Sequence, residues 1–259
     1  MPDELWEIVR PLIPAVPPRP QGGGTAVTDD RAVFTAIVFV LSSGCAWRHL
    51  PPSFGVSMPT AHHRFTAWTE AGLWPKLHWA VLDRLGAAGD IDWSSAILDA
   101  AAVRAKGGSL TGPNPVDRGR TGSKLHVLSD ANGLPLLVGV SAAHTHDSHA
   151  LQPMIQGLPA IRSRRGPRRR KPARLRADKA YDSAAHRTWL RERGIIPRIA
   201  RRGIDTSDRL GRHRWKIERT IAWLTGYRRL TIRYERHAHL FAAFLSLAAA
   251  ITYFKKLAT

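Results

Sequence analysis

Two aspartates stand where carboxylates could hold a divalent cation. Asp99 and Asp178 each follow a short strand-like run, residues 95–98 and 173–177. If these runs are neighbouring strands of one sheet, the carboxylates approach each other, and such a pair is costly unless a cation lies between them. Mg²⁺ prefers oxygen ligands and usually takes one or two carboxylates together with substrate phosphate. The pair therefore predicts metal-dependent phosphoryl transfer.

A third carboxylate, Glu218, lies on a predicted helix. Ile217, Ile221 and Leu224 form the neighbouring buried stripe, so Glu218 stands at its edge and can point toward the sheet. The alternative is a surface ion pair with Arg214, which shares its helix face. Three carboxylates suit two metal ions about 3.5–4 Å apart, which activate the attacking oxygen and stabilise the leaving one.

Charge indicates the substrate. Lys and Arg number 39 against 20 Asp and Glu, a formal net charge of +19. Such a field attracts polyanions, of which nucleic acid is the commonest. The alternative is a solvated basic surface. Residues 162–176 hold nine basic side chains and are predicted to form a flexible loop that contacts phosphates beside the Asp178 site: Arg162, Arg164, Arg165, Arg168, Arg169, Arg170, Lys171, Arg174 and Arg176.

Other candidate DNA contacts are scattered along the chain. Lys124 and His126 lie on a predicted strand and either face the substrate or form its polar side. The remaining candidates are His62, Arg64, Arg214, Arg219, Arg228, Arg229, Arg233 and Arg236. His62 and His63 are interpreted as surface or capping residues rather than metal ligands. The group of His144, His146, Asp147 and His149 fits no usual zinc spacing and is interpreted as a loop.

The elements that carry these residues fall into two parts. Residues 1–90 read as helices with Pro and Gly breaks, and a helix over 28–43, a break, and a short basic helix from 57 resemble a helix-turn-helix unit. Residues 91–259 read as a mixed α/β sheet flanked by helices. Its predicted strands are 95–98, 124–129, 134–140, 173–177 and 195–200, with a hairpin at Asn132-Gly133.

Cysteine usage and hydropathy further narrow the class of protein to which the chain can belong. Cys45 is the one cysteine, so no internal disulfide and no Cys-based zinc site is expected. The longest largely apolar stretch, residues 240–254, has 15 residues, fewer than the ~20 that span a bilayer. We expect it to be a buried helix in a cytoplasmic protein without a signal peptide.

Several motifs resemble the DDE transposases of bacterial insertion sequences, the insertion-sequence-five group. They cover nearly the whole chain in order: residues 44–51 (GCAWRHLP), 98–105 (LDAAAVRA), 122–126 (GSKLH), 177–183 (ADKAYDS), 214–224 (RWKIERTIAWL), 228–230 (RRL) and 233–236 (RYER). The separations from Asp99 to Asp178 and from Asp178 to Glu218, 79 and 40 residues, are similar to those of the group.

The resemblance implies an RNase H-like catalytic domain with Asp99 after the first strand, Asp178 after the fourth, and Glu218 on a following helix. It implies an enzyme that uses Mg²⁺ or Mn²⁺ to cleave double-stranded DNA at element ends and transfer it to target DNA, as a homodimer or larger. Asp182 competes with Asp178 for the second position, although a helix cap with Ser183 is its plainer role. Relatives often carry Tyr and Lys where this chain has Gly211 and Thr225.

Two other functions remain open at this point. A metal-dependent nuclease of the same fold would cut without joining, and a non-catalytic DNA-binding remnant would keep only binding. Both need the basic surface, and the first also needs the carboxylates. The presence of all three acids, Asp99, Asp178 and Glu218, argues against decay of the catalytic site.

Overall fold

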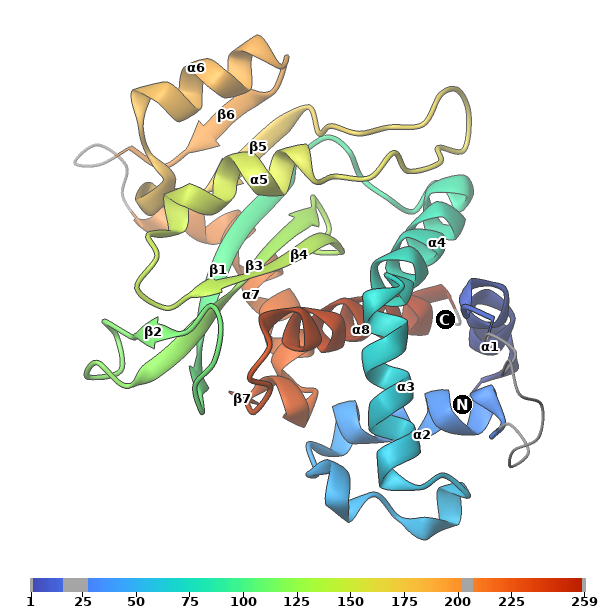
Figure 1. The fold of residues 1–259 in the computed structure, drawn as a ribbon. Helices are drawn as coiled ribbons and strands as arrows, with labels where there is room; N and C mark the ends of the chain where they lie inside the picture. Colours follow the sequence, from blue (N-terminus) through green and yellow to red (C-terminus); the bar gives the residue numbers. More distant parts are fainter. Residues whose placement is uncertain (1, 16–27, 202–206, 258–259) are drawn as a thin grey trace.

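The computed structural model describes residues 2–15, 28–201 and 207–257, and for residues 207–214 and 256–257 it describes the backbone alone. A twisted sheet forms one part of the molecule and a group of helices the other, with the C-terminal helix α8 (Ala238–Leu257) between them (Figure 1).

Four helices make up the first part, as expected. They are α1 (Asp3–Val9), α2 (Asp30–Ser43), α3 (Met58–Glu70) and α4 (Leu73–Ala88). Asp29 caps α2 by accepting the N–H groups of Arg31 and Ala32, and Ser57 caps α3 through Thr60. The predicted helix-turn-helix is placed differently, because residues 44–57 separate α2 from α3. The tight connection lies between α3 and α4, where Gly72 takes a left-handed φ of 72°.

The predicted mixed α/β sheet is confirmed. Its strands are β1 (Ala96–Ala105), β2 (Gly112–Pro113), β3 (Thr121–Asp130), β4 (Pro135–Ala142), β5 (Arg174–Ala177), β6 (Ile196–Ile199) and β7 (Ile232–Arg233). β3 pairs antiparallel with both β1 and β4, whereas β5 runs parallel to β1 and β6 parallel to β5. Antiparallel strands followed by parallel ones that alternate with helices are the arrangement expected of an RNase H-like domain.

The first strand is longer than predicted. The apolar run stops at Leu98, but β1 continues through Asp99 to Ala105 because β3 stays paired with it as far as Arg104, opposite Gly122. β7 then adds to its far end at Arg104 and Ala105. Asp99 therefore lies within a strand rather than at its end, and its backbone is held on the β3 side.

The predicted hairpin is present between β3 and β4. Gly133 takes the positive φ of 88° that favours glycine, and the buried Asp130 carboxylate accepts N–H groups from Asp92, Asn132 and Leu134. Burial raises the pKa of Asp130, while those three hydrogen bonds oppose the rise. The Asn-Gly signal located the turn, and the aspartate before it holds the turn closed.

Helices cover both faces of the sheet. α5 (Leu151–Gln156) lies over one face and α7 (Ser207–Thr225) over the other, while α6 (Ala184–Glu192) connects β5 to β6 (Figure 1). The Met154 sulfur on α5 would lie 3.2 Å from a Cβ at Gly139, which pairs with His126. The face that carries His126 is therefore the face that α5 covers.

Helix α8 is the core helix of the molecule, as expected for residues 240–254. It contacts α3, α4, α7 and β4, and Phe244 stacks on Phe65 at a ring distance of 4.3 Å. Residues 238–255 are long and apolar enough to cross a membrane by length and composition, but 67% of that stretch is buried inside the molecule. One continuous hydrophobic cluster runs from Leu5 to Phe254, so the helices and the sheet share a core across the predicted boundary at residue 90.

Candidate active site

The sheet brings Asp99 and Asp178 together. In the parallel pairing of β1 with β5, Leu98 lies opposite Ala177, so the two aspartates follow at the next register position. β5 ends there, and both side chains are half-buried. The Asp178 carboxylate accepts the Ala180 N–H at 2.9 Å and so caps the short helix η5 (Lys179–Tyr181). Two carboxylates at one open position of a sheet form a natural cation site.

Glu218 lies on the helix that covers the same face as Asp99. Asp99 pairs with Val127, and Val127 alternates with His126, so the Asp99 side chain points away from α5 and toward the α7 side. α7 contacts β1 and β3, and Glu218 on it is exposed. Within the described residues, no three His, Cys, Asp or Glu side chains are grouped to hold a single metal ion. Glu218 is therefore not gathered with the two aspartates in this conformation.

Tyr181 is a neighbour of the two aspartates, and the sequence alone predicts no role for it. Its side chain is 1% exposed, and its hydroxyl has no hydrogen-bond partner within the described part of the chain. Burial, and then the charges of Asp147, Asp99 and Asp178, raise the pKa of Tyr181, so the hydroxyl stays protonated at neutral pH. A buried phenol with an unused proton therefore lies close to the carboxylates.

Lys124 and His126 are engaged on the α5 side of the sheet. The Lys124 ammonium lies 2.7 Å from the Asp147 carboxylate and donates to the Thr145 carbonyl at 2.8 Å. His126 lies 2.7 Å from the Ser141 hydroxyl, and burial lowers its pKa to about 4, so the ring is neutral at pH 7. Lys124 is 15% exposed, which leaves little of it for DNA in this conformation.

Asp182 has a structural partner. Its carboxylate binds the Arg187 guanidinium at 2.7 Å, and Ser183 caps α6 by accepting the His186 N–H. Asp178, by contrast, stands at the register position next to Asp99. The geometry thus favours Asp178 over Asp182 for the second acid.

The basic residues on α7 are only partly described. Arg214 falls in the stretch 207–214, whose side chains lie outside the described part. Lys216 donates to the Ala131 carbonyl, and Arg219 donates to the Asn132 carbonyl while stacking on Trp215 and Trp223. These contacts hold α7 against the β3–β4 turn, so Lys216 and Arg219 are not freely available to bind DNA phosphate in place of the Tyr and Lys that relatives carry at Gly211 and Thr225.

Arg229 and Arg233 are buried, which corrects the expectation that they extend a DNA-binding face. Arg229 is 5% exposed, binds Glu235 at 2.7 Å and donates to the Cys45 carbonyl at 2.8 Å. Arg233 is fully buried and donates to the Ser123 hydroxyl at 2.7 Å and to four backbone carbonyls. Their neighbours Arg228 and Arg236 are exposed and remain candidates.

The N-terminal candidates also differ from each other. His62 is exposed on α3 and meets the Trp47 ring edge-on at 5.3 Å. The Arg64 side chain is 14% exposed and lies 3.4 Å from Asp30 on α2, so it ties two helices together. In the histidine-rich segment, His146 caps the short 3-10 helix η4 (Asp147–Ala150). The loop expected there is therefore wrong for Asp147 and His149, which lie in this helix.

The basic run is not beside the aspartates. Residues 162–173 lead into the first residue of β5, whereas Asp178 follows its last residue. Ala173 donates to the Trp93 carbonyl, ahead of β1, so the run lies at the opposite end of the two strands (Figure 1). Arg164, Arg165, Arg169 and Arg170 are exposed there, and Arg168 binds Asp83.

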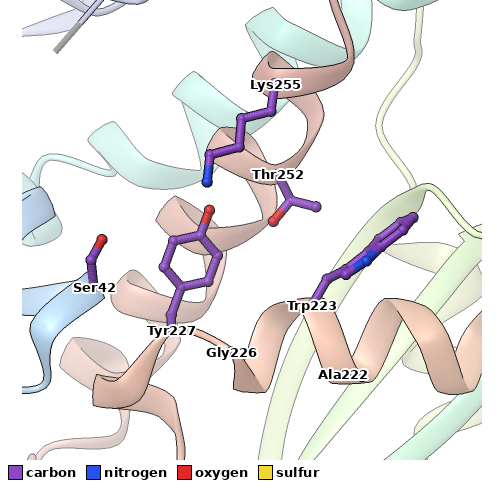
Figure 2. Close-up of a pocket in the computed structure, with 7 residues that line it drawn as sticks. All are labelled: Ser42, Ala222, Trp223, Gly226, Tyr227, Thr252 and Lys255. Carbon is purple, nitrogen blue, oxygen red and sulfur yellow. The ribbon is translucent and has the colours of Figure 1, made fainter. Parts of the chain in front are cut away.

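A hollow of about 560 Å³ lies at the C-terminal end of α7. It is lined by Trp223 and Tyr227 from one side and by Thr252 and Lys255 of α8 from another (Figure 2). The Lys255 ammonium stands 5.7 Å from the centre of the Tyr227 ring. No candidate acid lines this hollow.

Two family models match the chain. Residues 1–78 match a family described as a putative transposase of the IS4/5 family, and residues 94–253 match the transposase DDE domain. The second match covers more than half of the chain.

Known relatives agree with these matches. A putative transposase for insertion sequence element IS402 of Burkholderia cepacia is 48% identical over 141 residues, which are 54% of this chain and 67% of that protein. An uncharacterized 16.2 kDa protein of the same element is 41% identical over 44% of this chain and 79% of its own length. The Mos1 transposase paired-end complex aligns over 94% of this chain and 82% of its own, but 12% identity and a TM-score of 0.27 establish nothing.

The chain belongs to the DDE transposases of insertion sequences. It is therefore a DNA-acting enzyme of phosphoryl transfer that uses a divalent metal ion.

Proposed function

We propose that this transposase cuts the ends of its insertion sequence and joins them to target DNA, with Asp99, Asp178 and Glu218 as the metal-binding and catalytic residues. The observation that supports this most directly is the register of β1 against β5, which sets Asp99 beside Asp178 at the open end of β5. The family match covers all three residues.

The two aspartates fit a hard cation. Both are half-buried, both offer oxygen ligands, and DNA phosphate can supply further oxygens. A bound Mg²⁺ or Mn²⁺ would polarise the scissile phosphate and neutralise the charge that develops on it. Asp99 is held rigidly within its strand and Asp178 by the Ala180 N–H, so the pair is positioned before any ion arrives.

Glu218 and Tyr181 have different tasks in this proposal. Glu218 is carried by α7 over the face to which Asp99 points, and it completes the ligand set once DNA is bound. The Tyr181 hydroxyl is protonated, is buried near the carboxylates and has no hydrogen-bond partner among the described residues, so it would donate a hydrogen bond to them once the site closes around a bound ion and DNA. In cleavage, water attacks phosphorus and the 3′ oxygen departs as a 3′-OH. In joining, that 3′-OH attacks a phosphorus of the target strand, and the 3′ oxygen of the target strand departs as a new 3′-OH.

The decisive experiment is a cleavage and strand-transfer assay on DNA that carries the element ends, with Mg²⁺ or Mn²⁺. Asp99→Asn, Asp178→Asn and Glu218→Gln should each abolish both products and leave DNA binding largely intact. Asp182→Asn is the matched control, because Asp182 is a neighbouring carboxylate that binds Arg187, and it should still cut. A triad variant that cuts normally would remove that residue from the proposal.

Other outcomes would select the alternatives. Cutting without joining would favour a nuclease, and binding without chemistry under either metal would favour a DNA-binding remnant. We also propose that the enzyme works in the cytoplasm as a homodimer or larger on DNA, and that residues 1–90 bind the element ends. Sedimentation of the protein with and without end DNA tests the assembly.

A further inference from the structure

Residues 159–173, here called the arginine arm, form a shaped part of the fold and not the flexible loop expected from Gly166, Pro167 and Pro172. Ile161 and Arg169 exchange both backbone hydrogen bonds, at 2.9 and 2.8 Å, so the arm folds back on itself. At its tip the Ser163 hydroxyl donates to the Pro167 carbonyl at 2.7 Å. The backbone of the arm is therefore held in a set shape.

The arm is fixed to α4 at its base. Asp83 accepts two hydrogen bonds from the Arg168 guanidinium, at 2.9 and 2.8 Å, and a third from the Arg162 N–H at 2.9 Å. The two backbones touch at Gly86, where a Cβ would lie 2.0 Å from the Arg162 carbonyl oxygen. A glycine is required at this crossing, so α4 and the arm are built to fit each other.

Several exposed arginines of the arm are left for another partner. Arg164, Arg165, Arg169 and Arg170 are exposed, and none of them forms an ion pair with a described residue. Three of them, all but Arg170, line a hollow of about 450 Å³ beside Trp93. Besides Asp83, which binds Arg168, the acids Asp90 and Asp92 line the adjoining hollow and do not balance four positive charges. Guanidinium groups in this number, carried on a backbone of set shape, suit a row of phosphates.

The arm is far from the carboxylates. Five residues of extended chain separate Ala173 at the arm from Asp178, about 16 Å at roughly 3.3 Å per residue. Each base pair of duplex DNA advances ~3.4 Å along the helix axis, so this span corresponds to about five base pairs. The same arginines cannot grip the phosphate that is cut.

We propose that the arginine arm binds the backbone of duplex DNA about five or more base pairs from the phosphate on which Asp99 and Asp178 act. The inference rests on the proposed function only for the place of the cut. Because phosphate contacts carry no sequence information, the arm sets the position of the duplex and adds affinity without choosing its sequence.

The test measures binding in the absence of metal ions, by fluorescence anisotropy, on duplexes extended on either side of the cleavage site from about 2 to about 15 base pairs. For the wild type we expect affinity to rise at least on the order of tenfold once one flank reaches the arm. We call this rise in affinity with duplex length the affinity step. Replacing Arg164, Arg165, Arg169 and Arg170 with alanine should remove it. It should also lower the salt slope by about 0.9 for each arginine that contacts a phosphate.

The matched control replaces four exposed arginines elsewhere, Arg118, Arg120, Arg191 and Arg198, with alanine. This variant loses the same charge and should keep the step. A wild type without a step, or an arm variant that keeps it, would overturn the proposal. Because no cleavage is measured, loss of the step is independent of whether Asp99, Asp178 and Glu218 are the catalytic residues.

Discussion

Two arginine-rich segments, residues 162–170 and 228–236, look alike in the sequence and take opposite positions in the structure. In the first, Asp83 forms an ion pair with Arg168, and five further arginines stay exposed: Arg162, Arg164, Arg165, Arg169 and Arg170. In the second, Arg229 and Arg233 are buried with all their partners inside the protein. Arg229 links η6 (Arg228–Leu230) to the Cys45 carbonyl and to Glu235.

The difference lies in the acceptors within reach. A guanidinium stays charged, so it enters the interior only where oxygens take up its protons. Arg233 finds the Ser109 and Leu110 carbonyls and the Ser123 hydroxyl, more than 100 residues away in the sequence. The arm offers no comparable set of oxygens to Arg165 or Arg170, so their charge is available to DNA.

The strongest test of this comparison is Arg229→Ala. Removing one partner of a buried ion pair leaves the other charge uncompensated, and we expect the free energy of unfolding to fall by about 3–5 kcal/mol. Urea denaturation measures the change. Arg165→Ala, in the exposed segment, should stay within about 0.5 kcal/mol of the wild type. Equal losses in the two variants would erase the distinction between the segments.

A second test concerns buried histidines, which are neutral, in contrast to the buried arginines, which keep their charge. Burial lowers the pKa values of His78 and His126 to about 4, against 6.5 in the unfolded chain. The unfolded state therefore takes up protons first as the pH falls below 6.5, and stability is lost. Between pH 7.5 and 5 each histidine should cost about 2 kcal/mol.

The raised pKa of Asp130 opposes this trend, because the folded state binds its proton more readily. The histidine contribution is therefore isolated by comparing His126→Asn with the wild type at both pH values. The variant should lose less stability on acidification. An identical loss would show that His126 is already charged in the folded protein.

The mildest expected effect concerns the anchor of the arm. Asp83→Asn removes the charge that holds Arg168, but the pair is partly exposed, so stability should fall by about 1 kcal/mol or less. Hydrogen exchange of the Arg169 N–H, which is bound to Ile161, should become faster as the arm loosens. Glu192→Gln, at an exposed pair with Arg193, is the control and should leave that exchange unchanged. Unchanged exchange in Asp83→Asn would mean that the arm holds its shape without this anchor.

Local patterns predicted much of the fold. The strand that ends before Asp178, the Asn-Gly turn and the helix cap at Ser183 all lie where the residues placed them, because each depends on near neighbours. The run before Asp99 is also a strand, but its predicted end is wrong, because β1 continues to Ala105. The same reasoning set two aspartates side by side. Their metal-binding and catalytic roles stay a prediction, as does the role of Glu218.

What escaped prediction depends on distant partners. The residues near Arg229 do not predict its hydrogen bond to the Cys45 carbonyl, 184 residues away. The residues near Leu98 do not predict that pairing with β3 extends β1 beyond Asp99. The sequence predicts the arm beside the aspartates because the arm precedes Asp178 in the chain. In the structure β5 separates them, so the arm lies at one end of this strand and Asp178 at the other. The pKa of Tyr181 is raised by burial and then by the charge of Asp147, which approaches from another part of the fold and which no local pattern predicts.

The position of α8 in the core has a consequence for how the protein folds during synthesis. This helix is synthesised after every other helix and strand described here, yet Phe244 fills the centre of the N-terminal helices by stacking on Phe65 and Trp47. A ribosome adds about 5–20 residues per second, so those helices wait on the order of ten seconds or more for their missing core. Until then the nascent chain exposes aromatic surface, and chaperones that hold such surfaces would set the yield of native enzyme.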